Sequence, residues 1–323
     1  MVAPRALNPR AWRSVLGALL LGFSLHASAS NELQLLQQIN QAAHTTSFIG
    51  VFSHQQTQGL YTARLYHAVS PVGPVVRLES LDGPPREIIR SSEGVWAYLP
   101  DRREIRVTPH HPLRPDFPAL FLGSGEEVLQ HYKIQRRSGQ RVAGLETELI
   151  ELVPHDGYRW RVRCWVERSR RLLLRQQLVD TEGSVREEYV FSEIRLGPVQ
   201  EKLVKSRFAG QPGWTQSVNP MRKLPLPGGL SALPGGFALS AALMSPDGRL
   251  RQWVFTDGLA TISLFAEQVS PGVSEDTLVQ QGSLSMVSRR RGDLKVTALG
   301  EVPLASAVAL AEAFPMSVLQ AAR

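Results

Sequence analysis

The sequence predicts an α+β fold with two domains. A large antiparallel sheet curls around helices into a half-open β-barrel, and a smaller α+β domain follows it. Residues 146–196 form successive short segments that alternate apolar and polar side chains, with turn residues between them. Similar segments recur from residue 47 onward. A stretch rich in Pro and Gly at residues 197–232 then separates them from a second group of alternating segments.

An amphipathic helix is expected first, over residues 32–45, because apolar residues recur at steps of three and four from Leu33 to Ala43. Short strands separated by turn residues follow it. A flat sheet of this width would expose its edges, so we expect it to curl around a helix. The expected strands of the first domain are residues 47–53, 60–68, 75–81, 86–90, 94–99, 104–107, 132–136, 146–152, 159–167, 172–179 and 185–191, with a second helix at 119–132.

The strand at residues 159–167 alternates most clearly, which indicates one wet and one dry face. Its wet face carries the arginines at 159, 161 and 163. Its dry face carries Trp160, Val162, Cys164 and Val166. A sheet curled over helices tends to enclose an apolar cavity, so Trp160, Val162 and Val166 are candidates for lining a lipid site. A fully packed core is the alternative. The single Cys164 cannot form an intramolecular disulfide and is expected to be a buried hydrophobic residue.

The first 29 residues are expected to be a signal peptide rather than part of the fold. Three arginines precede an apolar run at residues 15–25, and Ala27 and Ala29 are the small residues typical of a cleavage site. The protein is therefore expected in the periplasm. Loss of residues 1–29 removes three of the 36 basic residues and none of the 29 acidic ones, which leaves a net charge of about +4. Nucleic acid is not an expected partner of such an exported protein.

The predicted domains are residues 30–196 and 233–323, joined by a Pro/Gly-rich linker at 197–232. The composition of the linker predicts a limited interface between the domains and a variable angle between them. The second domain is expected to contain a sheet and one terminal helix. Its predicted strands are residues 237–244, 249–256, 259–269, 282–288 and 295–302, and its predicted helix is 305–314.

The sequence lacks the motifs of common hydrolases, metalloenzymes and nucleotide-binding enzymes. The adjacent His110 and His111, with Asp116 nearby, form the densest histidine site. Adjacent side chains of an extended chain point to opposite faces, so the two histidines would chelate one ion poorly. We therefore expect no catalytic residues, no metal site and no cofactor, and a binding protein rather than an enzyme.

Three basic clusters are candidates for binding carboxylates or lipid phosphates, which arginine can grip with two parallel hydrogen bonds. Solubility and protection of sheet edges are the alternative explanation. We expect the cluster Arg289, Arg290 and Arg291 to contact acidic groups of a partner. The other two clusters are Arg136, Arg137 and Arg141, and Arg168, Arg170 and Arg171.

The meander of residues 165–191 is similar to the lipoprotein-carrier-like fold of LolA, LolB and RseB/MucB proteins. Four blocks of the second domain narrow the resemblance to the RseB/MucB family, the periplasmic regulators of an envelope-stress sigma factor. These blocks are Leu233–Phe237, Thr256–Ala260, Ser263–Phe265 and Val296–Pro303. Residues 47–52 after the first helix also fit. The resemblance covers essentially the whole chain after residue 29.

The resemblance implies a non-enzymatic regulator that binds the periplasmic domain of a membrane anti-sigma factor of the RseA/MucA type and shields it from a site-1 protease. Lipid or lipopolysaccharide is implied as the signal for release. The family has no compact binding motif, so no individual binding residue is carried over. A periplasmic lipoprotein or lipid carrier of the LolA type is the alternative function, and a hydrolase without a recognised motif is a more distant one. The oligomeric state stays open.

Overall fold

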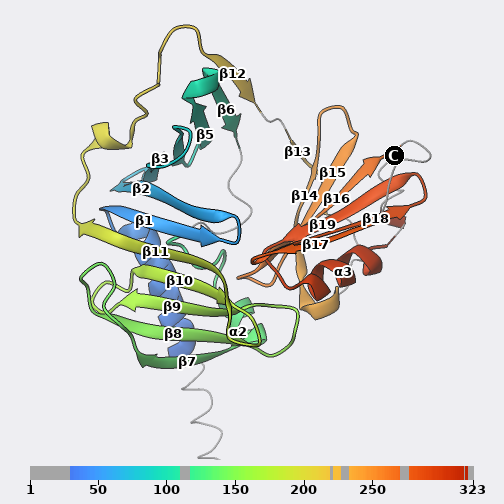
Figure 1. The fold of residues 1–323 in the computed structure, drawn as a ribbon, viewed down its shortest axis with the longest axis horizontal. Helices are drawn as coiled ribbons and strands as arrows, with labels where there is room; N and C mark the ends of the chain where they lie inside the picture. The colour runs from blue at the N-terminus through green and yellow to red at the C-terminus, as the bar shows by residue number, and fades with distance from the viewer. Residues whose placement is uncertain are drawn as a thin grey trace, which may run out of the picture.

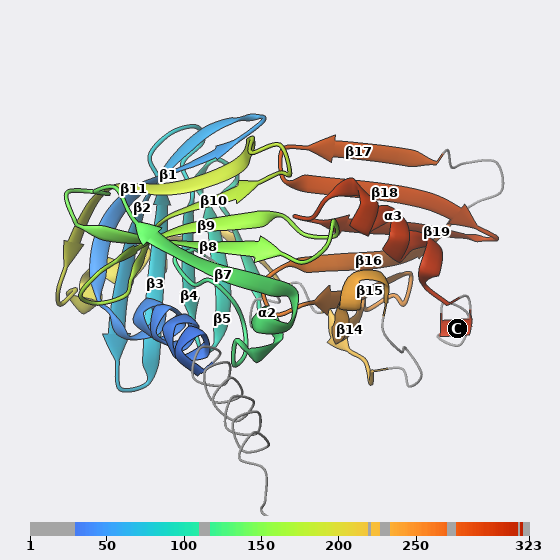
Figure 2. The same ribbon diagram turned by 90° about the horizontal axis from the view of Figure 1, so that it is seen from below.

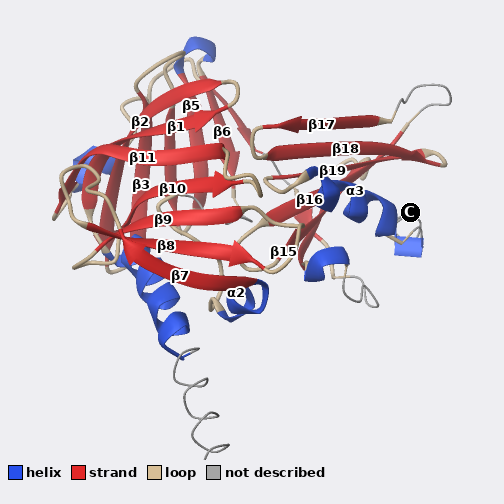
Figure 3. Cartoon of the chain, turned by 60° about the horizontal axis from the view of Figure 1, so that its bottom comes forward, coloured by secondary structure: helices blue, strands red, loops and turns tan. Residues whose placement is uncertain are grey.

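The structure is a computed structural model that describes residues 30–109, 117–218, 221–226, 233–269, 276–315 and 317–318. The expected signal peptide lies outside the described residues, as do His110, His111 and Asp116. Two β-sheets lie side by side, each with helices on one face (Figures 1 and 3). This arrangement confirms the predicted α+β class with a large and a small sheet.

The large sheet is 12-stranded and open, because β12 and β7 lie at its two ends and do not pair with each other. Every neighbouring pair is antiparallel except β12 and β6, which are parallel. The sheet order is β12-β6-β5-β4-β3-β2-β1-β11-β10-β9-β8-β7. The strands are β1 Phe48–Gln56, β2 Gly59–Ser70, β3 Gly73–Ser80, β4 Glu87–Ser91, β5 Gly94–Leu99, β6 Glu104–Thr108, β7 Tyr132–Ser138, β8 Thr147–Pro154, β9 Arg161–Glu167, β10 Leu173–Val179, β11 Val185–Leu196 and β12 Thr215–Val218.

The N-terminal helix of residues 30–45 crosses one face of strands β7 to β11 (Figure 1). Its apolar stripe forms a buried cluster with side chains of those strands. Leu36 and Ile39 are completely buried in this cluster together with Ile150 and Cys164. Burial raises the pKa of the Cys164 thiol, so this cysteine is an inert core residue, as the sequence predicted.

A group of aromatic rings forms a second packed region around Phe117. The Phe117 ring stacks on Tyr189 of β11 with centroids 5.4 Å apart. It also lies 5.6 Å from Phe52 of β1 and 5.1 Å from Phe191 of β11. Aromatic pairs at such distances stabilise a core beyond the area that they bury. Phe117 therefore anchors its segment of the chain to the centre of the large sheet.

The second helix is shorter than predicted, and α2 runs only from Glu126 to His131. Gly125 precedes it with a left-handed φ of 87°, which ends the helix on the N-terminal side. A Cβ atom at Gly125 would lie 2.9 Å from the ring of Phe121. The chain before α2 is therefore an irregular segment packed on the core rather than the first half of a helix.

The predicted linker is largely structured and lies along the large sheet (Figure 1). A 3-10 helix, η2, spans Glu201–Val204, and β12 adds to the edge of the large sheet. The short strand β13, Arg222–Lys223, then pairs with β14 of the small sheet. Only residues 219–221 separate these two strands. The sequence missed β12 and β13 because their side chains are exposed and show no alternation of burial.

The small sheet is 7-stranded, in the order β13-β14-β15-β16-β19-β18-β17, and α3 covers one of its faces (Figure 2). Trp253 and Phe314 pack at its centre with ring centroids 4.9 Å apart. Strand β17 was not predicted, because most of its side chains are exposed. The elements are β14 Ala238–Met244, β15 Leu250–Thr256, β16 Thr261–Gln268, β17 Thr277–Gln281, β18 Leu284–Arg291, β19 Leu294–Gly300 and α3 Leu304–Ala313, with short 3-10 helices η1 Pro100–Arg102 and η3 Pro234–Gly236.

Candidate functional site

The three predicted cavity residues lie in two different environments. Val162 and Val166 are 2% and 0% exposed and belong to the core cluster that contains Leu36 of the N-terminal helix. The indole of Trp160 instead donates a hydrogen bond of 3.0 Å to the carbonyl of Ser283 in the small domain. The structure therefore does not bring the three residues together around one open space. Their role in lipid binding stays a prediction.

Arg159 does not lie on a wet face, and this corrects the sequence interpretation. Strand β9 begins only at Arg161, so Arg159 precedes the alternating segment. Its side chain has no exposed surface. A buried guanidinium needs paired charges and hydrogen bonds. In this protein the partners come from residues far along the chain, which alternation within one strand cannot reveal.

Arg159 is the centre of a buried polar network between the two domains. Its guanidinium pairs with the carboxylates of Asp257 and Asp156 and donates to the carbonyl of Gly235. The same guanidinium lies 4.9 Å from the ring centroid of Phe237, which is a cation–π distance. Three of these four partners belong to the small domain or to the segment just before it, so Arg159 joins the two domains.

Asp257 is placed by the β15–β16 turn that it begins. Its carboxylate accepts hydrogen bonds from the backbone N–H groups of Leu259, 2.9 Å, and Ala260, 2.7 Å. The hydroxyl of Tyr132 lies 3.4 Å from the other carboxylate oxygen. Burial, and then the nearby Asp257 carboxylate, raise the pKa of Tyr132 well above its usual value. Hydrogen bonds within its own turn thus help to orient the Asp257 carboxylate towards Arg159.

Gly258 lets the same turn approach the large domain closely. Its φ of +95° is left-handed, and an added Cβ would lie 3.1 Å from the side chain of Glu127 in α2. The carbonyl of Gly258 accepts a hydrogen bond of 3.3 Å from the backbone of Leu122. A side chain at this position would push the β15–β16 turn away from α2.

A second turn of the small domain, between β17 and β18, contacts the large domain at Glu187. The Glu187 carboxylate accepts hydrogen bonds from Ser283 of this turn and from Gln56, 3.0 Å, and lies 2.5 Å from the ring of His54. Burial alone would raise the pKa of Glu187. The hydrogen bonds from His54, Ser283 and Gln56 outweigh burial and hold this pKa below its usual value.

The β17–β18 turn, like the β15–β16 turn, needs glycine because it approaches the large domain closely. Gly282 has a left-handed φ of +60°, and a Cβ there would lie 2.9 Å from the carbonyl of Arg186 and 2.8 Å from the hydroxyl of Thr57. Beside it, Gln58 and Gln281 share a hydrogen bond of 2.5 Å. Two glycine turns and a buried ion pair therefore join the domains at specific contacts, and the limited extent of the interface stays a prediction.

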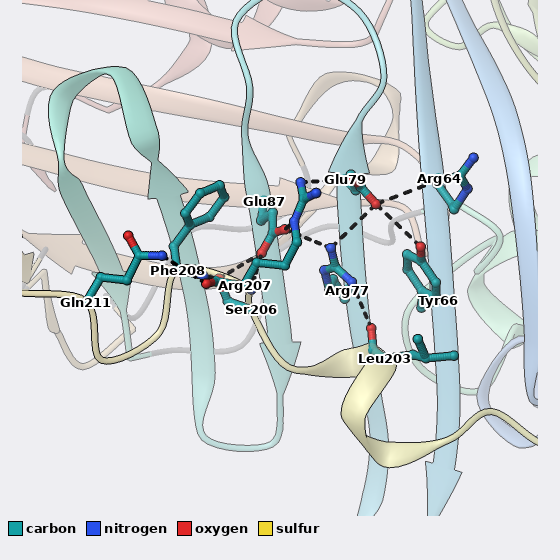
Figure 4. A network of polar contacts seen from close by, with 10 residues as sticks. All are labelled: Arg64, Tyr66, Arg77, Glu79, Glu87, Leu203, Ser206, Arg207, Phe208 and Gln211. Atoms are coloured by element: carbon teal, nitrogen blue, oxygen red, sulfur yellow. Dashed lines mark hydrogen bonds and ion pairs between the residues drawn. The ribbon is translucent and has the colours of Figure 1, made fainter.

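The linker is attached to the large domain by another buried network, shown in Figure 4. The carboxylate of Glu87 accepts hydrogen bonds of 2.7 Å each from Arg77, Ser206 and the Nε of Arg207. Arg77 also donates to the carbonyl of Leu203, 3.1 Å. Burial raises the pKa of Glu87, but the bonds from Ser206, Arg207 and Arg77 outweigh it and lower this pKa overall. Residues 203–207 are therefore held firmly on the sheet.

The predicted partner-binding arginines of the small domain have different surroundings. Arg291 donates a hydrogen bond of 2.6 Å to the carbonyl of Phe314 just after α3, so it stabilises the end of that helix. Arg289 lies 3.6 Å from the Asp276 carboxylate, and Arg290 is exposed. Their role in partner binding stays a prediction.

The other two basic clusters meet on the surface of the large domain, except for Arg141, which pairs with Glu146 instead. Two neighbouring clefts of about 450 and 440 Å³ are both lined by Arg168 and Arg171. The first also includes Arg170 and the last turns of the N-terminal helix, and the second includes Arg136 and Arg137 at the end of β7. These arginines stand out in the sequence, but the sequence does not place the two clusters together, because Arg136 lies on β7 and Arg168 in the β9–β10 turn.

Within the described residues, no group of three or more His, Cys, Asp or Glu side chains is placed to hold a metal ion. No helix in the same ranges is both long and apolar enough to cross a membrane.

Comparisons with known proteins match the chain over both domains. A model of the MucB/RseB N-terminal domain matches residues 31–210, and a model of the MucB/RseB C-terminal domain matches residues 229–314. The Sigma-E factor regulatory protein RseB of Escherichia coli (strain K12) is 24% identical over 322 residues, which cover 92% of this chain and 94% of RseB. The Sigma factor AlgU regulatory protein MucB of Pseudomonas aeruginosa is 26% identical over 297 residues, which cover 86% of this chain and 89% of MucB.

A solved structure described as the complex of Pseudomonas aeruginosa MucA/MucB has the same fold. It superposes with a TM-score of 0.66 and 22% identity, and the match covers 87% of this chain and 97% of the other. The N-terminal family model extends to residue 210 and so includes the linker residues that bind Glu87. The two family models together match well over half of the sequence, and the chain therefore belongs to the MucB/RseB family.

Proposed function

We propose that this protein is a negative regulator of a sigma-E-type envelope stress response and that it binds the periplasmic domain of a membrane anti-sigma factor. The match of both family domains along the chain is the observation that carries this proposal. Further support comes from the names of the curated relatives, which describe sigma factor regulation. Two similar solved structures contain MucB together with MucA. The proposed location is the periplasm, and the proposed action is binding without catalysis.

Binding would protect the anti-sigma factor by mass action. A protease must take its substrate as an exposed, extended segment, and a segment bound to the regulator is withheld from its active site. When the segment binds and leaves the regulator faster than the protease cuts it, the cleavage rate is proportional to the fraction of anti-sigma factor that is free. The proposal therefore requires only that the regulator concentration exceed the dissociation constant.

Lipid or lipopolysaccharide is the proposed signal for release. A ligand shifts a conformational equilibrium only if it prefers one of the states. A change in the angle between the domains would have to separate Arg159 from Asp257 and Glu187 from Ser283, which are buried contacts. Release by this route therefore needs a ligand that binds the separated state much more tightly. The effect must be reciprocal, so bound anti-sigma factor would weaken lipid binding by the same factor.

The experiment that tests the proposal measures cleavage of a purified anti-sigma periplasmic domain by a site-1 protease. We expect the mature chain to slow cleavage in a concentration-dependent manner, and lipid A to restore it. An unrelated periplasmic protein at equal concentration is the control. Cleavage at the same rate with and without the chain would refute shielding. Protection that lipid A leaves unchanged would refute the release signal but not the binding.

A further inference from the structure

The surface of the large domain contains two neighbouring basic clefts that share Arg168 and Arg171 in their lining. We name the pair of clefts the arginine groove. Its walls come from the β9–β10 turn, the end of the edge strand β7, the adjoining part of β8 and the last turns of the N-terminal helix. The arginines of the groove are Arg136, Arg137, Arg168, Arg170 and Arg171.

The groove contains fewer carboxylates than guanidinium groups. Glu148 is shared by Arg136, 2.7 Å, and Arg171, 2.8 Å. Arg168 donates through its Nε to a backbone carbonyl, and Arg170 has no side-chain partner within the part of the chain that the structure describes. Each guanidinium carries five N–H donors. Several donors and a net positive charge are therefore left for an anionic ligand.

The carboxylate of Glu151, beside the groove, is also shared by two arginines. It lies 3.3 Å from Arg137 and 2.8 Å from Arg163. Arg137 is 62% exposed and Arg136 is 50% exposed, so both side chains can reach a ligand from solvent. An incoming carboxylate could bind their remaining N–H groups without breaking the bonds to Glu148 or Glu151.

The second property of the groove is the open edge of β7, which ends the large sheet. An edge strand presents backbone N–H and C=O groups that an extended peptide can pair with. Lys133, Arg136 and Arg137 are exposed on this strand, and such charges repel neutral or basic strands. A strand that carries carboxylates would be attracted instead. Peptide main chain and carboxylates together would satisfy the edge, whereas a phosphate group could use only the arginines.

We propose that the arginine groove binds an acidic, extended polypeptide segment, with its main chain along β7 and its carboxylates against Arg136, Arg137, Arg168 and Arg170. In the context of the proposed function, on which this assignment rests, the segment belongs to the anti-sigma factor. The groove then differs from Arg289–Arg291, the cluster that the sequence favoured for partner binding.

The test uses the full mature chain and a fluorescently labelled peptide that alternates glutamate and threonine. A peptide with glutamine in place of each glutamate is the neutral control. We expect the acidic peptide alone to raise fluorescence anisotropy, with binding that weakens as salt is added. The double variant Arg168→Gln/Arg170→Gln should bind roughly tenfold more weakly, because two charge-assisted contacts are lost.

The matched control is Arg222→Gln/Arg249→Gln, which removes the same charge from exposed positions of the small sheet and its first turn. It should change the affinity by less than about twofold. A second groove variant, Arg136→Gln/Arg137→Gln, removes exposed side chains at the other end and should also weaken binding. Thermal unfolding checks that each variant is folded.

Three outcomes of the peptide experiment would overturn the proposal. The glutamine peptide could bind as well as the acidic one, or both groove variants could match the control variant. The wild type could also fail to bind the peptide but bind inorganic phosphate or vesicles of anionic phospholipid, which would assign the groove to a phosphate head group.

A parallel titration with the anti-sigma periplasmic domain distinguishes the groove assignment from the proposed function. If that domain binds the groove variants normally, the groove assignment fails and the proposed function stands. If it does not bind the wild type, the proposed function fails.

Discussion

Arg159 and Asp257 form an ion pair across the domain junction in which neither side chain has any exposed surface. The two residues lie 98 positions apart in the sequence. One precedes β9 of the large sheet, and the other begins the β15–β16 turn of the small domain. Charges taken out of water in this way are tolerated only when their partners are in place. The relative position of the two domains is therefore tied to this contact.

Replacing Asp257→Asn should lower the free energy of unfolding by about 3–5 kcal/mol, because Arg159 stays buried without its main charge partner. The measurement is chemical denaturation monitored by tryptophan fluorescence. Asp247→Asn is the control, since Asp247 is 61% exposed and 4.0 Å from Arg249. The Asp247→Asn change should alter the free energy of unfolding by no more than about 0.5 kcal/mol.

The double variant Arg159→Met/Asp257→Leu distinguishes charge from packing in the same experiment. We expect it to be more stable than Asp257→Asn, because no uncompensated charge is left in the junction. Equal stabilities of Asp257→Asn and the Asp247→Asn control would show that the ion pair is not a determinant of stability.

Glu187 should make stability depend on pH in the acidic range. Its folded pKa lies below the ordinary value of 4.5, so the unfolded state binds a proton more readily. The resulting stabilisation is present above pH about 4.5 and is lost as the pH falls through the folded pKa. The free energy of unfolding of the wild type should therefore fall as the solution is acidified below about pH 4.5.

Glu187→Gln isolates this contribution from those of other carboxylates, because the amide cannot titrate. The stability difference between wild type and Glu187→Gln should shrink as the pH is lowered from about 6 to about 3. The measurement is urea denaturation at a series of pH values. A difference that is constant over this range would rule out a lowered pKa of Glu187.

The network of Figure 4 should control how firmly the linker is held. Glu87→Ala removes the carboxylate 2.7 Å from the buried guanidinium of Arg77, which is 6% exposed and keeps only Glu79 at 3.4 Å as a charge partner, and should cost about 3 kcal/mol. Arg207 is 58% exposed, so Arg207→Ala should cost only about 1 kcal/mol. Hydrogen exchange of residues 201–218 should be faster in both variants than in the wild type. Unchanged exchange in Glu87→Ala would show that the linker is held by other contacts.

Val162→Asp should strongly destabilise the large domain, because Val162 is 2% exposed and a carboxylate there has no partner. The control is Val72→Asp, since Val72 is 82% exposed and tolerates a charge. In thermal unfolding, the Tm of Val162→Asp should lie far below that of the wild type, and the Tm of Val72→Asp should lie close to it. A stable Val162→Asp protein that has lost lipid binding would instead support a cavity in front of Val162.

Local side-chain patterns were sufficient to predict most strands. The alternation between Val162 and Val166 predicted β9, and the apolar stripe that includes Leu36 and Ile39 predicted the N-terminal helix. Such patterns exist because burial on one face repeats with the period of the element. Strands β12, β13 and β17 lack this pattern, since they lie at sheet edges where most side chains face solvent. Their pairing depends on backbone hydrogen bonds, which any residue but proline can donate.

The sequence by itself determined the fold class, the two domains, the buried Cys164 and the resemblance to the RseB/MucB family. The tertiary structure decided how the domains are joined and which arginines lie together. Arg159 was expected on a wet face because the only neighbours visible in the sequence were those of its own segment. Its burial depends on Asp257, and the groove depends on Arg136 and Arg168, which are brought together by folding. Hydrophobic periodicity is a local property, whereas charge pairing depends on distances in space that the sequence does not contain.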